Sequence, residues 1–121
     1  MPITYEVDET RSLTVTTLVG EVSREEIFAY YEQFMADTRC RSCTKSLIDL
    51  TSSIPVDGSP DWMQSISARS DPTTNVTRMA VIAPDDLRYG LSRAYEAYVD
   101  DQAVATGVFR NRSEAEAWLD L

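Results

Sequence analysis

The sequence predicts an α/β domain with four helices and a mostly parallel five-stranded sheet that has one antiparallel edge strand, in the order β-β-α-β-α-β-α-β-α. Three observations lead to this prediction. Hydrophobic residues alternate with polar ones in two N-terminal segments, continuous apolar runs occur at 46–50 and 79–83, and capping signals precede amphipathic helical patterns. Strands that alternate with helices of this length are joined by crossover connections, which make neighbouring strands parallel.

The two N-terminal segments predict a hairpin. Ile3, Tyr5 and Val7 alternate with polar residues, and after a break at 8–12 the alternation resumes over 13–19. Such alternation is typical of strands that are buried on one face only. The hairpin connection makes the first strand the antiparallel edge of the sheet.

The first predicted helix begins at a capping box, Ser23-Arg-Glu-Glu26. The serine hydroxyl is placed to accept a backbone N–H, and the glutamate reaches back to the N-cap. We expect the helix to fray near Thr38. Its apolar face carries Ile27, Tyr30, Tyr31 and Phe34 at helical spacing.

The apolar runs at 46–50 and 79–83 fit strands that are buried on both faces of a parallel sheet. Between them, Ser59 as N-cap and Pro60 as first helical residue predict a second helix. The buried face of this helix holds Trp62, Met63 and Ile66.

The remaining elements follow the second apolar run. Pro84-Asp-Asp86 caps a third helix, a last strand covers 105–109, and a second capping box at 113–116 begins a terminal helix. Because no linker or repeat interrupts the chain, we expect one domain over residues 1–121. The third helix has the apolar stripe Leu87, Leu91, Ala94, Tyr95 and Tyr98, and the terminal helix turns Ala115, Trp118 and Leu119 inward.

Composition excludes several classes of function. The formal net charge of −9 disfavours nucleic acid and anionic lipid as partners. The absence of histidine excludes Ser-His-Asp and Cys-His catalysis and histidine-ligated metals, and no glycine-rich phosphate loop is present. We therefore expect no metal, no cofactor and no enzymatic activity. The chain has neither a span-length apolar stretch nor a signal-peptide pattern at its start, so we expect no membrane span and a cytoplasmic location.

Cys40-Arg-Ser-Cys43 is the motif with the most chemical specificity. A redox pair needs a helix N-terminus to stabilise its thiolate, but this pair follows the C-terminal end of the first helix. A zinc site would need further ligands from a symmetric dimer. We therefore interpret both cysteines as ordinary thiols in a surface loop.

Four aspartates lie near the predicted strand ends, where ligands of open α/β sheets bind. Paired carboxylates at such an edge act as acid and base or hold a divalent cation. Helix capping and turn formation explain the same residues more simply, so we assign them no catalytic or metal role. These residues are Asp49, Asp57, Asp85 and Asp86.

Five segments of the chain carry a family resemblance. They are Ile3-Thr-Tyr5, Leu47-Ile-Asp-Leu50, Met79-Ala-Val-Ile-Ala-Pro84, Tyr89-Gly-Leu-Ser-Arg-Ala-Tyr-Glu96, and Val108-Phe-Arg with Glu114-Ala-Glu-Ala-Trp-Leu119. Together they resemble the SpoIIAA-like family over essentially the full chain. This is the fold of STAS domains (anti-sigma-factor antagonists) and of lipid-carrying CRAL-TRIO/SEC14 domains. The last two segments resemble a bacterial branch of short, stand-alone members.

The resemblance implies a regulatory site at the start of the second helix, where STAS regulators carry a phosphorylatable hydroxyl. Asp57 and Ser59 stand at about that position, but the glycine comes earlier and Pro60 replaces a glycine. The first hypothesis is thus a non-enzymatic STAS-like interaction or regulatory module. Its acidic surface meets a basic protein partner, and its partner or switch surface is Asp57, Ser59, Asp61 and Trp62.

The CRAL-TRIO resemblance implies a second hypothesis, a protein that binds a small apolar ligand. Its pocket lies between the sheet and the second and third helices, beside Trp62. A cavity removes core from a small domain, so a pocket at a homodimer interface suits this chain better. The pocket residues are Met63, Ile66, Leu91 and Tyr95.

Overall fold

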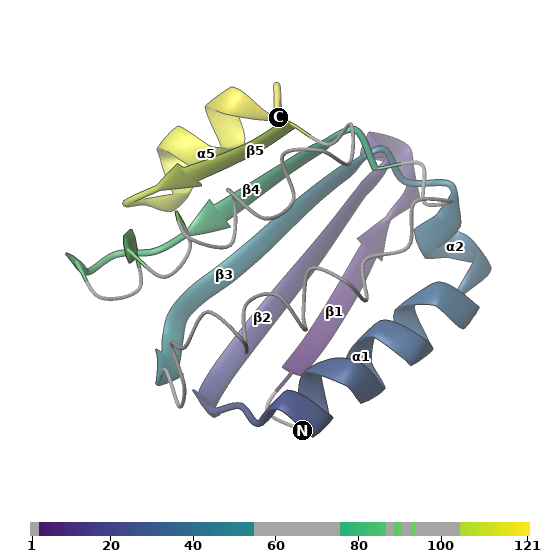
Figure 1. Cartoon of the computed structure of the whole chain (residues 1–121). Helices are drawn as coiled ribbons and strands as arrows, with labels where there is room; N and C mark the ends of the chain where they lie inside the picture. The colour runs from purple at the N-terminus through teal and green to yellow at the C-terminus, as the bar shows by residue number, and fades with distance from the viewer. Residues whose placement is uncertain (1–2, 55–75, 87–88, 91–92, 94–104) are drawn as a thin grey trace.

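A computed structural model describes residues 3–54, 76–86, 89–90, 93 and 105–121. One five-stranded sheet with the order β1-β2-β3-β4-β5 organises these residues (Figure 1). β1 and β2 pair antiparallel, whereas the other neighbours pair parallel. The mixed sheet with an antiparallel edge strand is therefore confirmed. The strands are β1 (Ile3–Asp8), β2 (Leu13–Glu21), β3 (Lys45–Ile54), β4 (Arg78–Ile82) and β5 (Ala105–Phe109).

Three α-helices and one 3-10 turn have bounds within the described residues. The first predicted helix is α1 (Arg24–Ala36), and the terminal one is α5 (Arg112–Trp118). A four-residue helix, α2 (Thr38–Arg41), follows α1, where the sequence predicted only fraying. The predicted second helix lies outside the described residues, and only part of the third lies inside them. The 3-10 turn η1 (Glu9–Arg11) joins β1 to β2.

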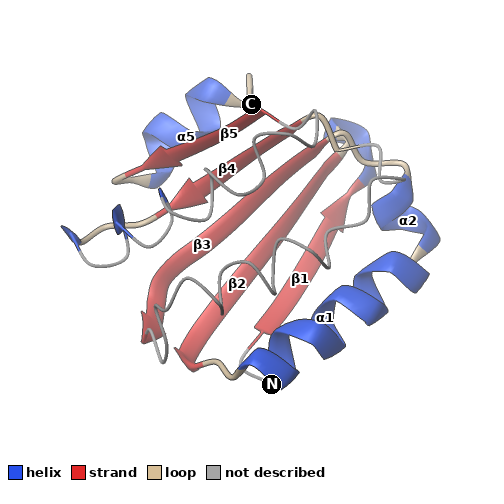
Figure 2. Ribbon diagram, in the orientation of Figure 1, coloured by secondary structure: helices blue, strands red, loops and turns tan. Residues whose placement is uncertain are grey.

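The sheet has one face toward α1 and one toward α5, which we call the α1 face and the α5 face (Figure 2). On the α1 face, the side chains of Tyr30 in α1 and Thr16 in β2 form a hydrogen bond, with 2.7 Å between the hydroxyl oxygens. On the α5 face, buried side chains from the central strands join the terminal helix in one cluster. That cluster contains Leu13, Leu47, Ala80, Ile82, Ala115 and Leu119.

The half-buried pattern predicted for β2 is wrong. Thr14 and Thr16 have 0% and 1% of their surface exposed, although they alternate with buried Leu13. Both faces of β2 are covered along this stretch, because Leu13 packs in the cluster with α5 and Thr16 forms a hydrogen bond with Tyr30 of α1. Val19, near the end of the strand, is instead 53% exposed.

The two predicted capping boxes had different outcomes. At α1, Glu26 N–H donates to Ser23 Oγ at 3.2 Å and Ser23 N–H donates to Glu26 Oε1 at 3.1 Å, which confirms the first box. At α5, the second box is wrong because Asn111 is the N-cap and its Oδ1 accepts the Glu114 N–H at 2.9 Å. Asn111 is already extended before the helix, so Ser113 lies inside the first turn.

Candidate functional site

The residues predicted for the partner surface and for the ligand pocket lie outside the described residues. Their arrangement therefore stays a prediction. They are Asp57, Ser59, Asp61, Trp62, Met63, Ile66, Leu91 and Tyr95. Of the four aspartates, Asp57 is also outside, while the other three are described.

The end of β3 that leads into the predicted partner surface contains a β-bulge. Thr17 pairs with Asp49 and the next pair is Val19 with Ser52, so β3 has one residue more than β2 between these pairs. The Asp49 carboxylate accepts the Thr51 N–H at 2.8 Å, which holds the bulge. Ser53 Oγ donates to the Leu50 carbonyl at 2.8 Å.

We call the surface formed by Val19, Glu21, Thr51 and Ser52 the β2–β3 end. All four residues are exposed, and Val19 is the one exposed large hydrophobic residue among those the structure describes. Gly20 stands between Val19 and Glu21 with a φ of 69°, a conformation that glycine adopts without strain. The β2–β3 end thus combines an apolar side chain, a carboxylate and two hydroxyls.

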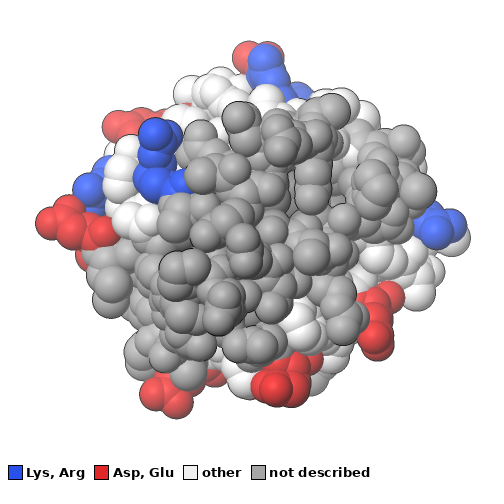
Figure 3. All heavy atoms as spheres, in the orientation of Figure 1, with Lys and Arg blue, Asp and Glu red and all other residues white. Residues whose placement is uncertain are grey.

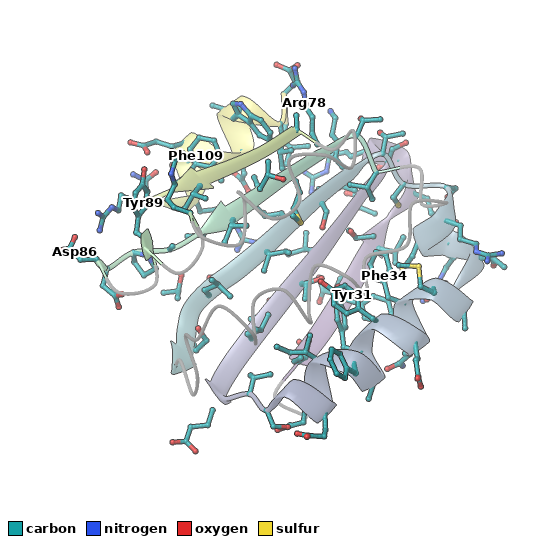
Figure 4. The ribbon with its side chains drawn as sticks, viewed as in Figure 1. Tyr31, Phe34, Arg78, Asp86, Tyr89 and Phe109 are labelled. Atoms are coloured by element: carbon teal, nitrogen blue, oxygen red, sulfur yellow. The ribbon has the colours of Figure 1, made fainter. Side chains whose placement is uncertain are left out.

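Asp86 forms a surface contact rather than a carboxylate pair. Its Oδ1 lies 3.0 Å from Arg110 Nη2, and its side chain is almost wholly exposed. The Arg110 guanidinium also lies 4.2 Å from the centre of the Tyr89 ring, and Figure 4 shows Tyr89 and Asp86 together beyond the end of β4. The Asp85 carbonyl accepts the Tyr89 N–H at 2.9 Å, as expected where a helix begins. Within the described ranges, no group of acidic or cysteine side chains is arranged to hold a metal.

The surface-loop interpretation of the cysteines is wrong. Cys40 lies in α2 and Cys43 just beyond it, and their exposures are 1% and 0%. Burial raises the pKa of the Cys40 thiol to about 11 and also raises the pKa of Cys43. Both groups are therefore protonated at neutral pH, whereas a nucleophilic or metal-binding cysteine must be a thiolate. The missed signal is Asp37, whose Oδ1 caps α2 by accepting the Arg39 N–H at 3.0 Å.

Asp37 also ties α2 to the edge strand. The Tyr5 hydroxyl donates to Asp37 Oδ2 at 2.9 Å, and Arg39 Nη2 donates to the same oxygen at 2.9 Å. Burial, reinforced by Asp37, raises the pKa of Tyr5 to about 12, while Arg39 and Tyr5 hold the pKa of Asp37 well below its usual range. The three side chains form a structural link between β1 and α2.

An aromatic group surrounds this link. Tyr5 meets Tyr30 and Phe34 edge-to-face, with ring centroids 6.0 and 5.7 Å apart. The ring centroids of Tyr30 and Tyr31 lie 5.5 Å apart, and Figure 4 shows Tyr31 and Phe34 on the side of α1 that faces the sheet. The predicted apolar face of the first helix is confirmed, since Ile27 and Phe34 are buried and both tyrosines are half-buried.

Charge is spread over the surface that Figure 3 shows. The described Asp and Glu side chains lie at separate places around the rim of this view, with Lys and Arg between some of them. In this view the described carboxylates form no single patch. In the described segments, no helix has the length and apolar character needed to cross a membrane.

Two solved structures share this architecture. An uncharacterized protein of the DUF3478 family with a SpoIIAA-like fold, from Shewanella loihica PV-4, superposes with a TM-score of 0.62 at 16% identity, covering 97% of this chain and 91% of its own. An anti-sigma factor antagonist from Mycobacterium paratuberculosis gives a TM-score of 0.53 at 13% identity, covering 98% and 95%. At such identities the likeness establishes the fold alone. No family model and no curated protein matches the sequence.

Proposed function

We propose, from the premise that this chain has a SpoIIAA-like fold, that it is a non-enzymatic STAS-like interaction or regulatory module. It is a single cytoplasmic domain over residues 1–121 with the predicted four helices, and it acts on a protein partner. The similarity to an anti-sigma factor antagonist supports this proposal at the level of fold. The observation that carries it is the β2–β3 end, where an exposed apolar side chain lies beside exposed polar groups.

The β2–β3 end and the predicted partner surface are close in sequence. β3 ends at Ile54, and Asp57 and Ser59 follow three and five positions later. Strand ends that lead into loops present side chains to partners on a rigid support. Val19 supplies the apolar contact, and Thr51 and Ser52 supply hydrogen-bonding groups at the rim.

The charge of the chain indicates the kind of partner. A molecule of net charge −9 attracts basic surfaces and repels acidic ones. Glu21 brings part of that charge next to Val19, and Glu25 is exposed four residues further along the chain. The partner therefore presents an apolar side chain flanked by Lys or Arg, and its association rate falls as salt is added.

The experiment compares partner capture by the immobilised full chain and by three variants. Val19→Ser and Glu21→Gln alter the β2–β3 end, while Glu9→Gln removes another exposed carboxylate, from η1. We expect the first two variants to lose a bound protein that the wild type and Glu9→Gln retain at low salt. Equal capture by all four chains would contradict the proposal.

A second function, binding of a small apolar ligand, is favoured by one observation. Thr14 Oγ1 and Thr106 Oγ1 are buried and have no hydrogen-bond partner among the described residues. Buried hydroxyls are normally paired, so these two indicate a further hydrogen-bonding group near the sheet. Native mass spectrometry tests this function, because a ligand adds mass that denaturation removes. The same spectrum tests the predicted homodimer.

A further inference from the structure

Among the described strands, β5 forms one border of the sheet and pairs with β4 alone (Figure 1). The Ala105 N–H donates to the Thr77 carbonyl at 2.9 Å. At the other end of β5, the Phe109 carbonyl accepts the Ala83 N–H at 2.8 Å. Successive residues of a strand direct their backbone groups to opposite sides, so residues 105, 107 and 109 face β4.

Thr106 and Val108 therefore direct their N–H and C=O groups away from β4. We call this side of the strand the outer edge of β5. Within the described residues, no backbone group bonds the outer edge. A row of unpaired donors and acceptors at a sheet border is a template for the addition of another strand.

The two border strands of the described sheet differ in their protection against such pairing. β1 carries the exposed Glu6 and ends in Asp8. Charged side chains on a border strand oppose the addition of a further strand. β5 has the sequence Ala105-Thr-Gly-Val-Phe109, which contains neither a charged residue nor a proline. Of the two borders, β5 is therefore the one suited to pairing.

Charge is balanced around β5. Two arginines follow the strand directly, and a third is aligned with Ala105, its first residue. Each of the three forms an ion pair, so the outer edge favours neither a basic nor an acidic partner. The net charge of −9 also has no local excess here that would repel a like surface. The pairs are Arg78–Asp120, Arg110–Asp86 and Arg112–Glu116, at 3.4, 3.0 and 3.5 Å.

The side chains of β5 fit an antiparallel copy of the same strand. With Gly107 opposite Gly107 of a second copy, Ala105 lies opposite Phe109, and Thr106 lies opposite Val108. Small residues then meet large ones, and β-branched residues meet each other. In this register Thr106 and Val108 form hydrogen-bonded pairs, while the glycines form the closer, non-bonded pair. Glycine suits that position, because a Cβ there would lie 2.7 Å from the Phe109 ring.

We propose that the outer edge of β5 is a homodimer interface, in which β5 pairs antiparallel with β5 of a second copy and joins the two sheets into one. The N–H and C=O groups of Thr106 bond those of Val108 in the second copy, and the reverse. Such an interface is isologous, because the same strand contributes on both sides. It is a different surface from the β2–β3 end, so it goes beyond the proposed function.

Sedimentation equilibrium of the full chain over a range of protein concentrations tests the interface. Val108→Pro and Thr106→Pro each remove one outward N–H and leave the bonds to β4 in place. Val108→Thr is the matched control, since it keeps the branched shape and the N–H. We expect the wild type and Val108→Thr to dimerise, and both proline variants to stay monomeric at the same concentrations. Circular dichroism checks the folding of each variant.

Amide hydrogen exchange locates the interface without any substitution. When about nine chains in ten are paired, the N–H groups of Thr106 and Val108 should exchange about tenfold more slowly than in a dilute sample, because they exchange only in the free copy. The N–H groups of Gly107 and Phe109, which face β4, are the internal reference and should be slow in both samples.

Three results would overturn the proposal. They are a monomer at every concentration, a dimer that both proline variants retain, and a dimer in which Thr106 and Val108 exchange as fast as in the dilute sample. Salt separates this interface from the proposed partner surface. Two copies of net charge −9 repel each other, so added salt strengthens the dimer, whereas it weakens the capture of a basic partner.

Discussion

The two faces of the sheet are held by different interactions. On the α5 face, Leu13, Leu47 and Leu119 are buried without polar partners, and Phe109 contacts Trp118 with ring centroids 5.6 Å apart. On the α1 face, Tyr5 and Tyr30 combine ring contacts with hydrogen bonds to Asp37 and Thr16. Within the described residues, the α5 face is thus held mainly by apolar packing, whereas the α1 face combines packing with hydrogen bonds.

The strongest test of this difference is a cavity on each face. Leu47→Ala removes a fully buried side chain from the α5 cluster, so we expect it to lower the free energy of unfolding by about 2–5 kcal/mol. Ile27→Ala, on the α1 face, is expected at the lower end of that range because Ile27 packs in a smaller cluster. Urea denaturation measures both. A larger loss for Ile27→Ala would contradict the comparison.

Gly107 tests the packing of the α5 face by adding an atom instead of removing atoms. A Cβ at this position would lie 2.7 Å from the Phe109 ring and 3.3 Å from Trp118. We expect Gly107→Ala to destabilise the protein by about 1–3 kcal/mol through overpacking. Gly90→Ala is the control, since a Cβ there meets nothing within 4 Å in a helical segment, and alanine should stabilise it by about 0.5–1 kcal/mol. Equal effects of the two substitutions would show that the ring contact is loose.

The hydrogen bond between Tyr30 and Thr16 on the α1 face is tested by substitution of both residues. Tyr30→Phe removes the partner of the buried Thr16 hydroxyl, and we expect a loss of about 1–2 kcal/mol. The double variant Thr16→Val/Tyr30→Phe leaves no hydroxyl unpaired and should recover part of this loss. Thermal and urea denaturation measure the free energy of unfolding of each variant in this double-mutant cycle. Additive losses would mean that the two side chains are not coupled.

The smallest expected effect on stability comes from alkaline pH and concerns Cys40 in α2. The pKa of Cys40 is raised in the folded state from its ordinary 9.0 to about 11, so the thiol ionises more readily in the unfolded chain. Its contribution to stability is complete below pH 9 and is lost as the pH rises toward 11. We expect Cys40→Ala to show a shallower fall in stability over that window. Rapid reaction of native Cys40 with a thiol reagent at neutral pH would contradict the burial.

The sheet was the most predictable part of the molecule. The run at 105–109 is the strand β5 with the same bounds, and the run at 79–83 differs from β4 by one residue at each end. The short length of these runs favours strands over buried helix segments, which periodicity alone does not distinguish. The parallel pairing of the later strands was predictable from the helical patterns between them, which imply crossover connections.

The errors arose where tertiary context outweighed the local pattern. Alternation in β2 could not reveal that both faces are covered, because burial depends on the elements that pack against each face of the sheet. The short helix that buries Cys40 is specified by Asp37, which caps α2 and also accepts the Tyr5 hydroxyl from β1. The candidate site was less predictable than the fold, since the bulge in β3 depends on a side-chain bond from Asp49 to the backbone.

The most direct test of the proposed function is the affinity of the captured partner for the wild type, Glu21→Gln and Glu9→Gln at two salt concentrations. We predict that Glu21→Gln binds several-fold more weakly than the wild type at low salt, that the difference shrinks at high salt, and that Glu9→Gln matches the wild type. Equal weakening by both substitutions would instead reflect net charge alone. That result would contradict a binding surface at the β2–β3 end.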